Sequence, residues 1–321
     1  MFNWRFQNIV GWLALGTLLV SCRSGSGTPS ATETTRTVVH AMGSSKVPVS
    51  PQRVVVLDTA PLDAALALGI KPIGTAIYGQ PPDYLGDQVE EIEVIGDANQ
   101  PKLETILKLK PDLILGSKIG TEEQYNQLSQ IAPTVLTEDS GRSGDDWQAN
   151  LQLYANALGQ PEQAKQLLQD YRQRVQQLRT VVQPQALEIS VLIVATDVVR
   201  AYTTGSFSGS ILQDIGLSRP PVQDAPDGYA LQLSPEALDT LDGDYIFLIY
   251  SAYRPGRLSK ADFITDSIWS QLNAVQQGRV CQVNNEVWIA GRSVLAANQI
   301  LADVEACLAS GEVEHLNLLK K

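Results

Sequence analysis

The chain has 321 residues, 44% of them hydrophobic, and a formal net charge of −11 at pH 7. Binding to a phosphate backbone needs clustered lysines and arginines, so this acidic balance argues against a nucleic-acid partner. The two histidines, His40 and His315, are too few for a transition-metal site built from several imidazoles, so we expect no direct metal site.

An apolar run near the N-terminus is typical of a signal peptide. The run covers residues 9–20 behind Arg5 and is shorter than the ~20 residues that a membrane-spanning helix needs. It ends in Leu19-Val20-Ser21-Cys22, which resembles the lipobox of bacterial lipoproteins. The resemblance implies cleavage before Cys22 and attachment of a lipid to its sulfur. The alternative is an ordinary secretory signal, or a buried strand, with a chance cysteine.

The following segment predicts a flexible tether. Residues 23–36 contain no large apolar side chain and cannot support burial, so we assign 1–21 to the signal peptide and 22–36 to the tether. Removal of the signal peptide takes away one charge, Arg5, and leaves the mature chain at −12. We therefore expect a protein in the periplasm, or on the outer face of the cytoplasmic membrane, that is held there by a lipid on Cys22.

The first half of the mature chain alternates short apolar strands with helices. The strands are expected at residues 53–57, 70–77, 112–115 and 134–136, and the helices at 61–68, 101–110 and 125–131. This alternation calls for a largely parallel sheet with right-handed crossovers. We assign residues 37–160 to an N-terminal α/β lobe, because the length allows a core divided between two domains.

The longest helical pattern begins at Pro161 and ends near Pro184. Its apolar residues fall at helical spacing along one face, namely Ala164, Leu167, Leu168, Tyr171, Val175, Leu178, Val181 and Val182. Such a helix of about six turns would reach about 30 Å. We interpret residues 161–183 as a strut between two α/β halves; a partner helix for a coiled coil is the alternative.

The second half repeats the pattern of the first. Strands are expected at residues 189–195, 245–249 and 279–283, and helices at 209–215, 235–241 and 294–309; residues 269–274 precede the last of these strands. This gives a C-terminal α/β lobe over 184–310 and a polar tail over 311–321. Cys281 lies in a predicted strand and Cys307 in the closing helix. Spacing alone leaves open whether they form a disulfide or remain two buried thiols.

Short pieces of sequence, ordered and spaced over residues 37–310, resemble the siderophore-type substrate-binding lipoproteins of ABC importers. No single piece is specific, and the resemblance depends on their order. They are PQRVV at 51–55, ALGIKPIG at 67–74, PKLE at 101–104, KPDLI at 110–114, IAPTV at 131–135, GSF at 205–207, ILQDIGL at 211–217, LSPE at 233–236 and AAN at 296–298.

The resemblance implies an α/β fold of two lobes, each with a mainly parallel sheet flanked by helices, joined by one long rigid helix. This is the class III, or helical-backbone, binding-protein fold. It implies a monomer without an intrinsic cofactor and without enzymatic activity. The expected ligand is an Fe(III)–siderophore complex, captured in the cleft between the lobes and delivered to a permease dimer in the inner membrane. A continuous helix bends less than paired strand hinges, so we expect modest closure.

Glu104 and Glu236 are the expected docking residues. Each lies early in a short predicted helix at a matching place in its lobe. In the family, one exposed glutamate per lobe meets arginines of the permease, and these two residues match those positions. Exposed carboxylates can steer docking and fix orientation. The simpler interpretation is that each complements a helix N-terminus.

The expected ligand contacts are cationic and aromatic side chains in loops after strands. Arginine suits anionic chelate oxygens, and aromatic walls bury an organic scaffold. The candidates are Lys118, Arg142, Arg200, Tyr202, Tyr250, Tyr253, Arg254, Trp288 and Arg292. Any one of the arginines could instead be a solvated loop charge, and Trp288 could instead be part of the core.

One departure from the family pattern bears on the ligand. Hydroxamate binders can carry an arginine in the loop before Pro101, and here that loop reads Asp97-Ala98-Asn99-Gln100. We expect a citrate- or hydroxamate-type siderophore. Because the loop lacks this arginine, a citrate-based or mixed siderophore is favoured over a ferrichrome-like ligand.

Three other functions are weighed against this one. A cobalamin- or haem-binding protein of the same fold is the closest alternative, although haem would have to use a tyrosine as axial ligand. An exported enzyme is disfavoured because both histidines fall outside the predicted lobes. A passive envelope scaffold would leave the arginine and tyrosine loops without a role. Turnover assays and ligand titrations separate these classes.

Overall fold

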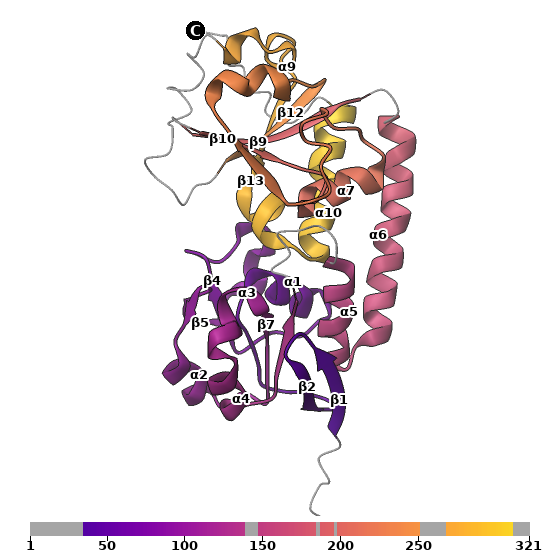
Figure 1. The fold of residues 1–321 in the computed structure, drawn as a ribbon. Coiled ribbons are helices and arrows are strands. Elements are labelled where there is room, and N and C mark those ends of the chain that lie inside the picture. Colours follow the sequence, from indigo (N-terminus) through magenta and orange to yellow (C-terminus); the bar gives the residue numbers. More distant parts are fainter. Residues whose placement is uncertain (1–34, 139–146, 184–186, 196–197, 251–267, 311–321) are drawn as a thin grey trace, which may run out of the picture. The chain divides into compact units, whose positions relative to one another are not determined.

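The structure, a computed structural model, describes residues 35–138, 147–183, 187–195, 198–250 and 268–310. Within these ranges the chain forms two α/β lobes, each around a mainly parallel sheet, as expected from the sequence (Figure 1). Helix α6 (Pro161–Val182) connects them along the chain. None of the helices in these ranges has the length and apolar character needed to cross a membrane.

The first lobe is built on a sheet of six strands in the order β6-β5-β4-β3-β7-β8. All neighbouring pairs are parallel except β5 and β6. The strands β3, β4, β7 and β8 are buried along their whole length, which explains their continuous apolar runs. The bounds are β3 (Val54–Val56), β4 (Gly74–Ile77), β5 (Glu93–Asp97), β6 (Gln100–Pro101), β7 (Leu113–Ser117) and β8 (Thr134–Thr137).

The three helices predicted in this lobe are present, two of them with shifted starts, and a further helix at Trp147–Leu158 was not predicted. Helix α1 begins at Thr59 and not at Pro61, because the Asp58 carboxylate caps it by accepting the Thr59 N–H at 2.6 Å. The helical segments are α1 (Thr59–Ala67), η1 (Asp83–Val89), α2 (Leu103–Leu109), α3 (Lys118–Thr121), η2 (Glu122–Gln124), α4 (Tyr125–Ile131) and α5 (Trp147–Leu158).

A hairpin of β1 (Thr35–His40) and β2 (Gly43–Pro48) begins the first lobe. Residues 35 and 36 therefore belong to a strand, where the sequence placed the end of the tether. The Arg36 guanidinium donates to the carbonyls of Val49 at 2.6 Å, Asn156 at 2.7 Å and Ala157 at 2.8 Å. These hydrogen bonds give partners to carbonyls in the last turn of α5, which have none within the helix. They also attach the hairpin to α5.

The second lobe has a five-stranded sheet in the order β11-β10-β9-β12-β13. The strands β9, β12 and β13 are parallel, and β10 runs antiparallel to both of its neighbours. The sequence interpretation missed β10 and treated its residues as a loop after β9. The bounds are β9 (Ile189–Ala195), β10 (Val198–Tyr202), β11 (Ala230–Leu233), β12 (Tyr245–Tyr250) and β13 (Val280–Asn284).

The second lobe's helical segments surround this sheet, and its two cysteines are joined. Cys281 on β13 and Cys307 after α10 form a disulfide with a Cα–Cα distance of 6.2 Å, which decides between the two alternatives that spacing left open. The segments are α7 (Phe207–Ile215), η5 (Pro235–Leu241), η6 (Trp269–Gln271), α9 (Asn273–Gln276), η7 (Glu286–Gly291), α10 (Val294–Glu305) and η8 (Ala306–Ser310).

Helix α6 buries the predicted apolar face. Its buried side chains are Ala164, Leu168, Tyr171, Val175, Leu178 and Val182, whereas Val181 is half exposed. The helix packs on α5 of the first lobe and on α7 and α10 of the second (Figure 1). One buried cluster continues from the first lobe through α6 into the second. The amphipathic face is thus used inside this chain, as the strut interpretation requires.

Candidate binding site at the facing sheet edges

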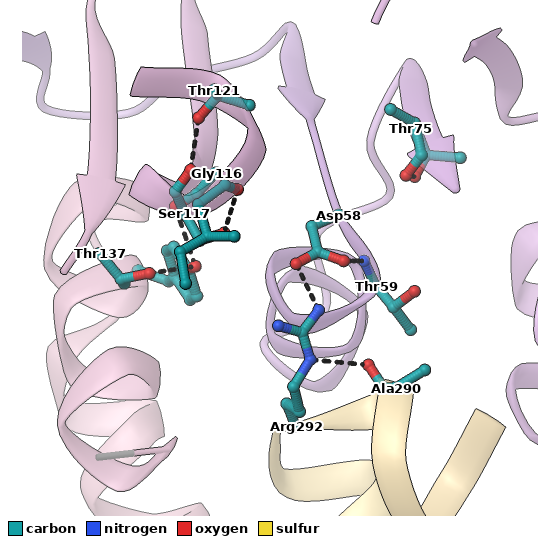
Figure 2. A network of polar contacts seen from close by, with 12 residues as sticks. Asp58, Thr59, Thr75, Gly116, Ser117, Thr121, Thr137, Ala290 and Arg292 are labelled. Carbon is teal, nitrogen blue, oxygen red and sulfur yellow. Dashed lines mark hydrogen bonds and ion pairs between the residues drawn. The ribbon is translucent and has the colours of Figure 1, made fainter. Parts of the chain in front are cut away.

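The carboxyl ends of the parallel strands form the candidate site, because ligands of open α/β sheets bind there. In the first lobe, Asp58 follows β3, Tyr78 follows β4 and Lys118 follows β7. In the second lobe, β13 ends at Asn284 and is followed by η7. An ion pair between Asp58 and Arg292, the residue after η7, brings the two edges together (Figure 2).

The Asp58–Arg292 pair is almost completely buried, with 3% and 4% of the two residues exposed. Arg292 adopts a left-handed backbone conformation at φ 53°, which ends η7 and directs its guanidinium towards Asp58. Its Nε donates to the Ala290 carbonyl at 3.1 Å (Figure 2). Burial alone would lower the pKa of Arg292, but the Asp58 carboxylate, together with Tyr78 and Tyr154, outweighs it and raises that pKa.

A second buried carboxylate, Asp63, also joins the two lobes. It lies on α1 and accepts the backbone N–H groups of Leu295 and Ala296, each at 2.9 Å, in the first turn of α10. The Tyr84 hydroxyl of η1 donates to it at 3.0 Å. The sequence analysis missed this residue, since an aspartate inside a predicted helix gives no sign of a partner more than 230 positions away.

The position of Asp63 predicts a pH-dependent stability. Burial raises the pKa of Asp63 from 3.8 to about 6, although its N–H and Tyr84 donors act in the opposite direction. The folded state therefore keeps this proton to higher pH than the unfolded chain, and stability falls as pH rises from about 4 to about 6. A shift of this size corresponds to roughly 3 kcal/mol.

A comparison of the wild type with Asp63→Asn, whose side chain does not titrate, checks this pH dependence of stability. We expect the difference in free energy of unfolding, wild type minus variant, to fall by about 3 kcal/mol between pH 3.5 and pH 7. Urea titrations at several pH values measure it. A difference that stays constant with pH would show that Asp63 is ionised as readily in the folded chain as in the unfolded chain.

Lys118 lies on the first-lobe edge, as the sequence predicted. Its side chain is 32% exposed, and its Nζ is 3.6 Å from both Glu122 and Glu138. The turn that carries it is held by the Thr121 hydroxyl, which donates to the Ser117 carbonyl (Figure 2). Lys118 is thus a positioned cation whose two exposed carboxylate neighbours can be displaced.

Two exposed apolar side chains accompany this cation on the same edge. Tyr78 follows β4 and is 37% exposed, and Ile119 follows Lys118 and is 49% exposed. A cation beside apolar and aromatic surface suits an anionic ligand with an organic scaffold. The sequence signal for both residues was their place directly after a predicted strand.

The structure places three of the predicted ligand residues in buried surroundings. Trp288 is fully buried, stacks on Phe247 at 4.6 Å between ring centroids, and donates from Nε1 to Asp303 at 2.8 Å. Arg292 is engaged by Asp58. Tyr202 is 2% exposed, and its strand β10 runs antiparallel, so it lies at the opposite edge of the sheet. All three residues are thus buried within the protein.

Two of the remaining candidates lie on strands, and the other three lie outside the described residues. Arg200 lies inside β10, where it pairs with Gln232 of β11, and not in a loop as predicted. Tyr250 is the last residue of β12 and so reaches the expected edge with its backbone. Arg142, Tyr253 and Arg254 lie outside the described residues, as do Cys22 and the signal peptide.

Glu104 and Glu236 are both exposed and lie in the first turn of a short helical segment, α2 and η5 respectively. A hydrogen bond with the Ser234 side chain lowers the pKa of Glu236 and favours its charged form. Both positions are therefore accessible to a partner.

A cavity of about 430 Å³ lies where η1 of the first lobe meets β13 and α10 of the second. Among the residues that the structure describes, its lining holds two carboxylates and no basic side chain, which disfavours an anionic chelate. The lining residues are Asp83, Tyr84, Gln282, Val283, Asn284, Val287, Gln299, Asp303 and Ala306. Over the described part of the chain, no three His, Cys, Asp or Glu side chains gather in a group that could hold a metal ion.

Known proteins resemble this chain over most of its length. A protein named "Probable siderophore-binding lipoprotein YfiY" from Bacillus subtilis is 35% identical over 89% of this chain and 91% of its own length. The achromobactin-binding periplasmic protein of Dickeya dadantii is 31% identical over 79% and 85%, respectively. The crystal structure of Staphylococcus aureus SirA complexed with staphyloferrin B has a TM-score of 0.75 at 28% identity, covering 85% of this chain and 98% of SirA.

The family comparison agrees with these individual similarities. Residues 54–287 match the model of the family described as periplasmic binding protein. This range contains both sheets' parallel strands and the whole of α6. The chain belongs to the periplasmic binding protein family.

Proposed function

We propose that this protein is the lipid-anchored substrate-binding component of an ABC importer and that it captures a ferric siderophore for delivery to a membrane permease. The observation that carries the proposal is the pair of facing sheet edges, with Lys118, Tyr78 and Ile119 on the first. The similar proteins named for siderophores, achromobactin and staphyloferrin B support the ligand class. Binding and release occur without chemical change in the ligand.

The proposed ligand carries its Fe(III) already chelated, in a complex that presents anionic oxygens. Lys118 would exchange Glu122 and Glu138 for these oxygens, while Tyr78 and Ile119 contact the organic scaffold. Citrate-type or hydroxamate-type chelates are the favoured classes. The loop 97–100 without an arginine favours citrate-based ligands within this set.

The proposed chain organisation places the binding lobes outside the cytoplasm. Residues 1–21 are removed, Cys22 carries the lipid, and a tether leads to the first lobe, which begins with β1 and ends near residue 160. The second lobe covers 184–310, followed by a polar tail over 311–321. A monomer of this organisation presents Glu104 and Glu236 to the two halves of a permease dimer.

Titration with defined ferric chelates tests the proposed ligand class. We expect saturable binding, at one chelate per chain, for ferric citrate or a ferric citrate-based siderophore, measured by quenching of tryptophan fluorescence. The iron-free chelators should bind more weakly, because chelation fixes the arrangement of their oxygens. Absence of saturable binding to citrate, hydroxamate and catecholate ferric complexes would contradict the proposal.

Lys118→Gln is expected to weaken binding of the ferric chelate by about 10- to 100-fold, the range for losing a hydrogen bond to a charged group. Lys71→Gln serves as the matched control, because Lys71 also pairs with an exposed glutamate, Glu91 at 3.2 Å, but precedes β4 and so lies away from the candidate edge. Isothermal titration measures both. Equal affinities of the two variants would remove Lys118 from the site.

A further inference from the structure

Polar contacts between the two lobes concentrate at one place. Helix α1 of the first lobe packs against η7 and α10 of the second, and both Asp58 and Asp63 reach across this boundary. Along the chain, α6 is the connection between the lobes. Helix α6 also packs on both lobes, and the contacts of Asp58 and Asp63 add a second place of attachment between them.

The Asp63 carboxylate accepts two backbone N–H groups across this boundary. Ser293, the N-cap residue of α10, makes no capping hydrogen bond through its side chain. The Asp63 carboxylate supplies this cap from the other lobe by accepting the N–H groups of Leu295 and Ala296. Because unpaired N–H groups at a helix start are costly when buried, the start of α10 is satisfied in the docked arrangement and exposed in an undocked one.

The backbone at the end of η7 is closely packed at this boundary. A Cβ atom added to Gly291 would lie 2.2 Å from the Ala296 Cβ and 3.2 Å from the Tyr84 hydroxyl. These neighbours belong to α10 and to η1, so the last residue of η7 is enclosed by elements of both lobes. Glu286 at the start of η7 also accepts the Asp83 N–H of η1 at 3.4 Å.

We infer that Asp58, Asp63 and Arg292 form a polar junction that fixes the spacing of the two lobes. They are positioning residues: they set the distance between the facing sheet edges. The junction is a property of the unliganded protein, so it stands or falls separately from the proposed function.

The distance between two spin labels, one in each lobe, tests this inference. Gln127 on α4 and Gln277 after α9 are both exposed, and each is replaced by cysteine in a chain carrying Cys22→Ser with the native disulfide intact. We expect one narrow distance distribution from double electron–electron resonance. Asp63→Ala and Asp58→Ala should each broaden or shift it.

Asp112→Ala is the matched control. Its carboxylate also accepts two backbone N–H groups, from Gln52 at 2.7 Å and Arg53 at 2.9 Å, but all three residues belong to the first lobe. This variant should lower stability and leave the interlobe distance unchanged. An unchanged distribution in both Asp58→Ala and Asp63→Ala would overturn the junction, as would an equal broadening in Asp112→Ala.

Hydrogen exchange supplies a readout that does not depend on the labels. In Asp63→Asn, which keeps the size of the side chain, the amides of Leu295 and Ala296 should exchange on the order of tenfold faster, because each loses a charged acceptor. The amides of Gln52 and Arg53 should keep their wild-type rates. Unchanged rates at Leu295 and Ala296 would contradict the role of Asp63 even if the alanine variants fail to fold.

Discussion

Removing one member of the Asp58–Arg292 pair is expected to lower the free energy of unfolding by about 3–5 kcal/mol, the range for breaking a buried ion pair. Both side chains are almost fully buried, so Arg292→Ala leaves an uncompensated carboxylate and Asp58→Ala leaves an uncompensated guanidinium. Asp58 also caps α1, so its replacement should be the more damaging of the two. Urea denaturation followed by circular dichroism measures the effect.

A double replacement distinguishes the loss of the ion pair from the cost of leaving one buried charge alone. Asp58→Asn with Arg292→Met removes both charges and should recover a large part of the loss, because the main penalty is the charge left alone. Lys165 and Glu162 provide the control: their ion pair is 2.6 Å long but 67% and 80% exposed. Its removal should cost at most about 1 kcal/mol. A loss of the same small size for Arg292→Ala would mean that water reaches the buried pair.

Reversing the charge of both Glu104 and Glu236 is expected to leave binding of the ferric chelate intact and to reduce cellular uptake on the order of 100-fold or more, as expected when two interfacial charge pairs become repulsive. Both residues are exposed on short helical segments, so their replacement leaves the core unchanged. Uptake of radioactive iron as the chelate, in cells that depend on this protein, measures transport. Titration of the purified variant measures binding.

A second double variant controls for the change in net charge. Glu123→Lys with Glu305→Lys changes the charge by the same amount at two other exposed glutamates. Uptake should then stay near the wild-type rate. If both double variants lowered uptake equally, long-range electrostatics would explain the loss, and Glu104 and Glu236 would have no specific docking role.

Local sequence patterns were sufficient for the central parallel strands of each lobe and for the long helix, but not for β1, β2, β5, β6, β11 or α5. Continuous apolar runs located β3, β7 and β9, because strands covered on both faces need apolar residues throughout. The apolar residues that the sequence places along one face of α6 include all six that the structure buries. The antiparallel strand β10 was missed, since pairing partners are set by the sheet and not by the residues of one short strand.

The residues of the candidate site were harder to predict from local sequence patterns. Lys118 was found because a cation directly after a parallel strand must lie at the carboxyl edge. The same rule failed for Tyr202, whose strand has the opposite direction, and for Trp288 and Arg292, which follow β13 but turn inward. Residue type and position after a strand do not determine the direction of a side chain.

The sequence by itself determined the class of fold, the two lobes and the helix that joins them, because each rests on hydrophobic spacing over neighbouring residues. The tertiary structure alone decided that Cys281 and Cys307 are bonded and that Arg292 pairs with Asp58. It also decided that Asp63 caps a helix of the other lobe. These are contacts between distant parts of the chain, whose energies depend on burial and on partners that no local pattern specifies.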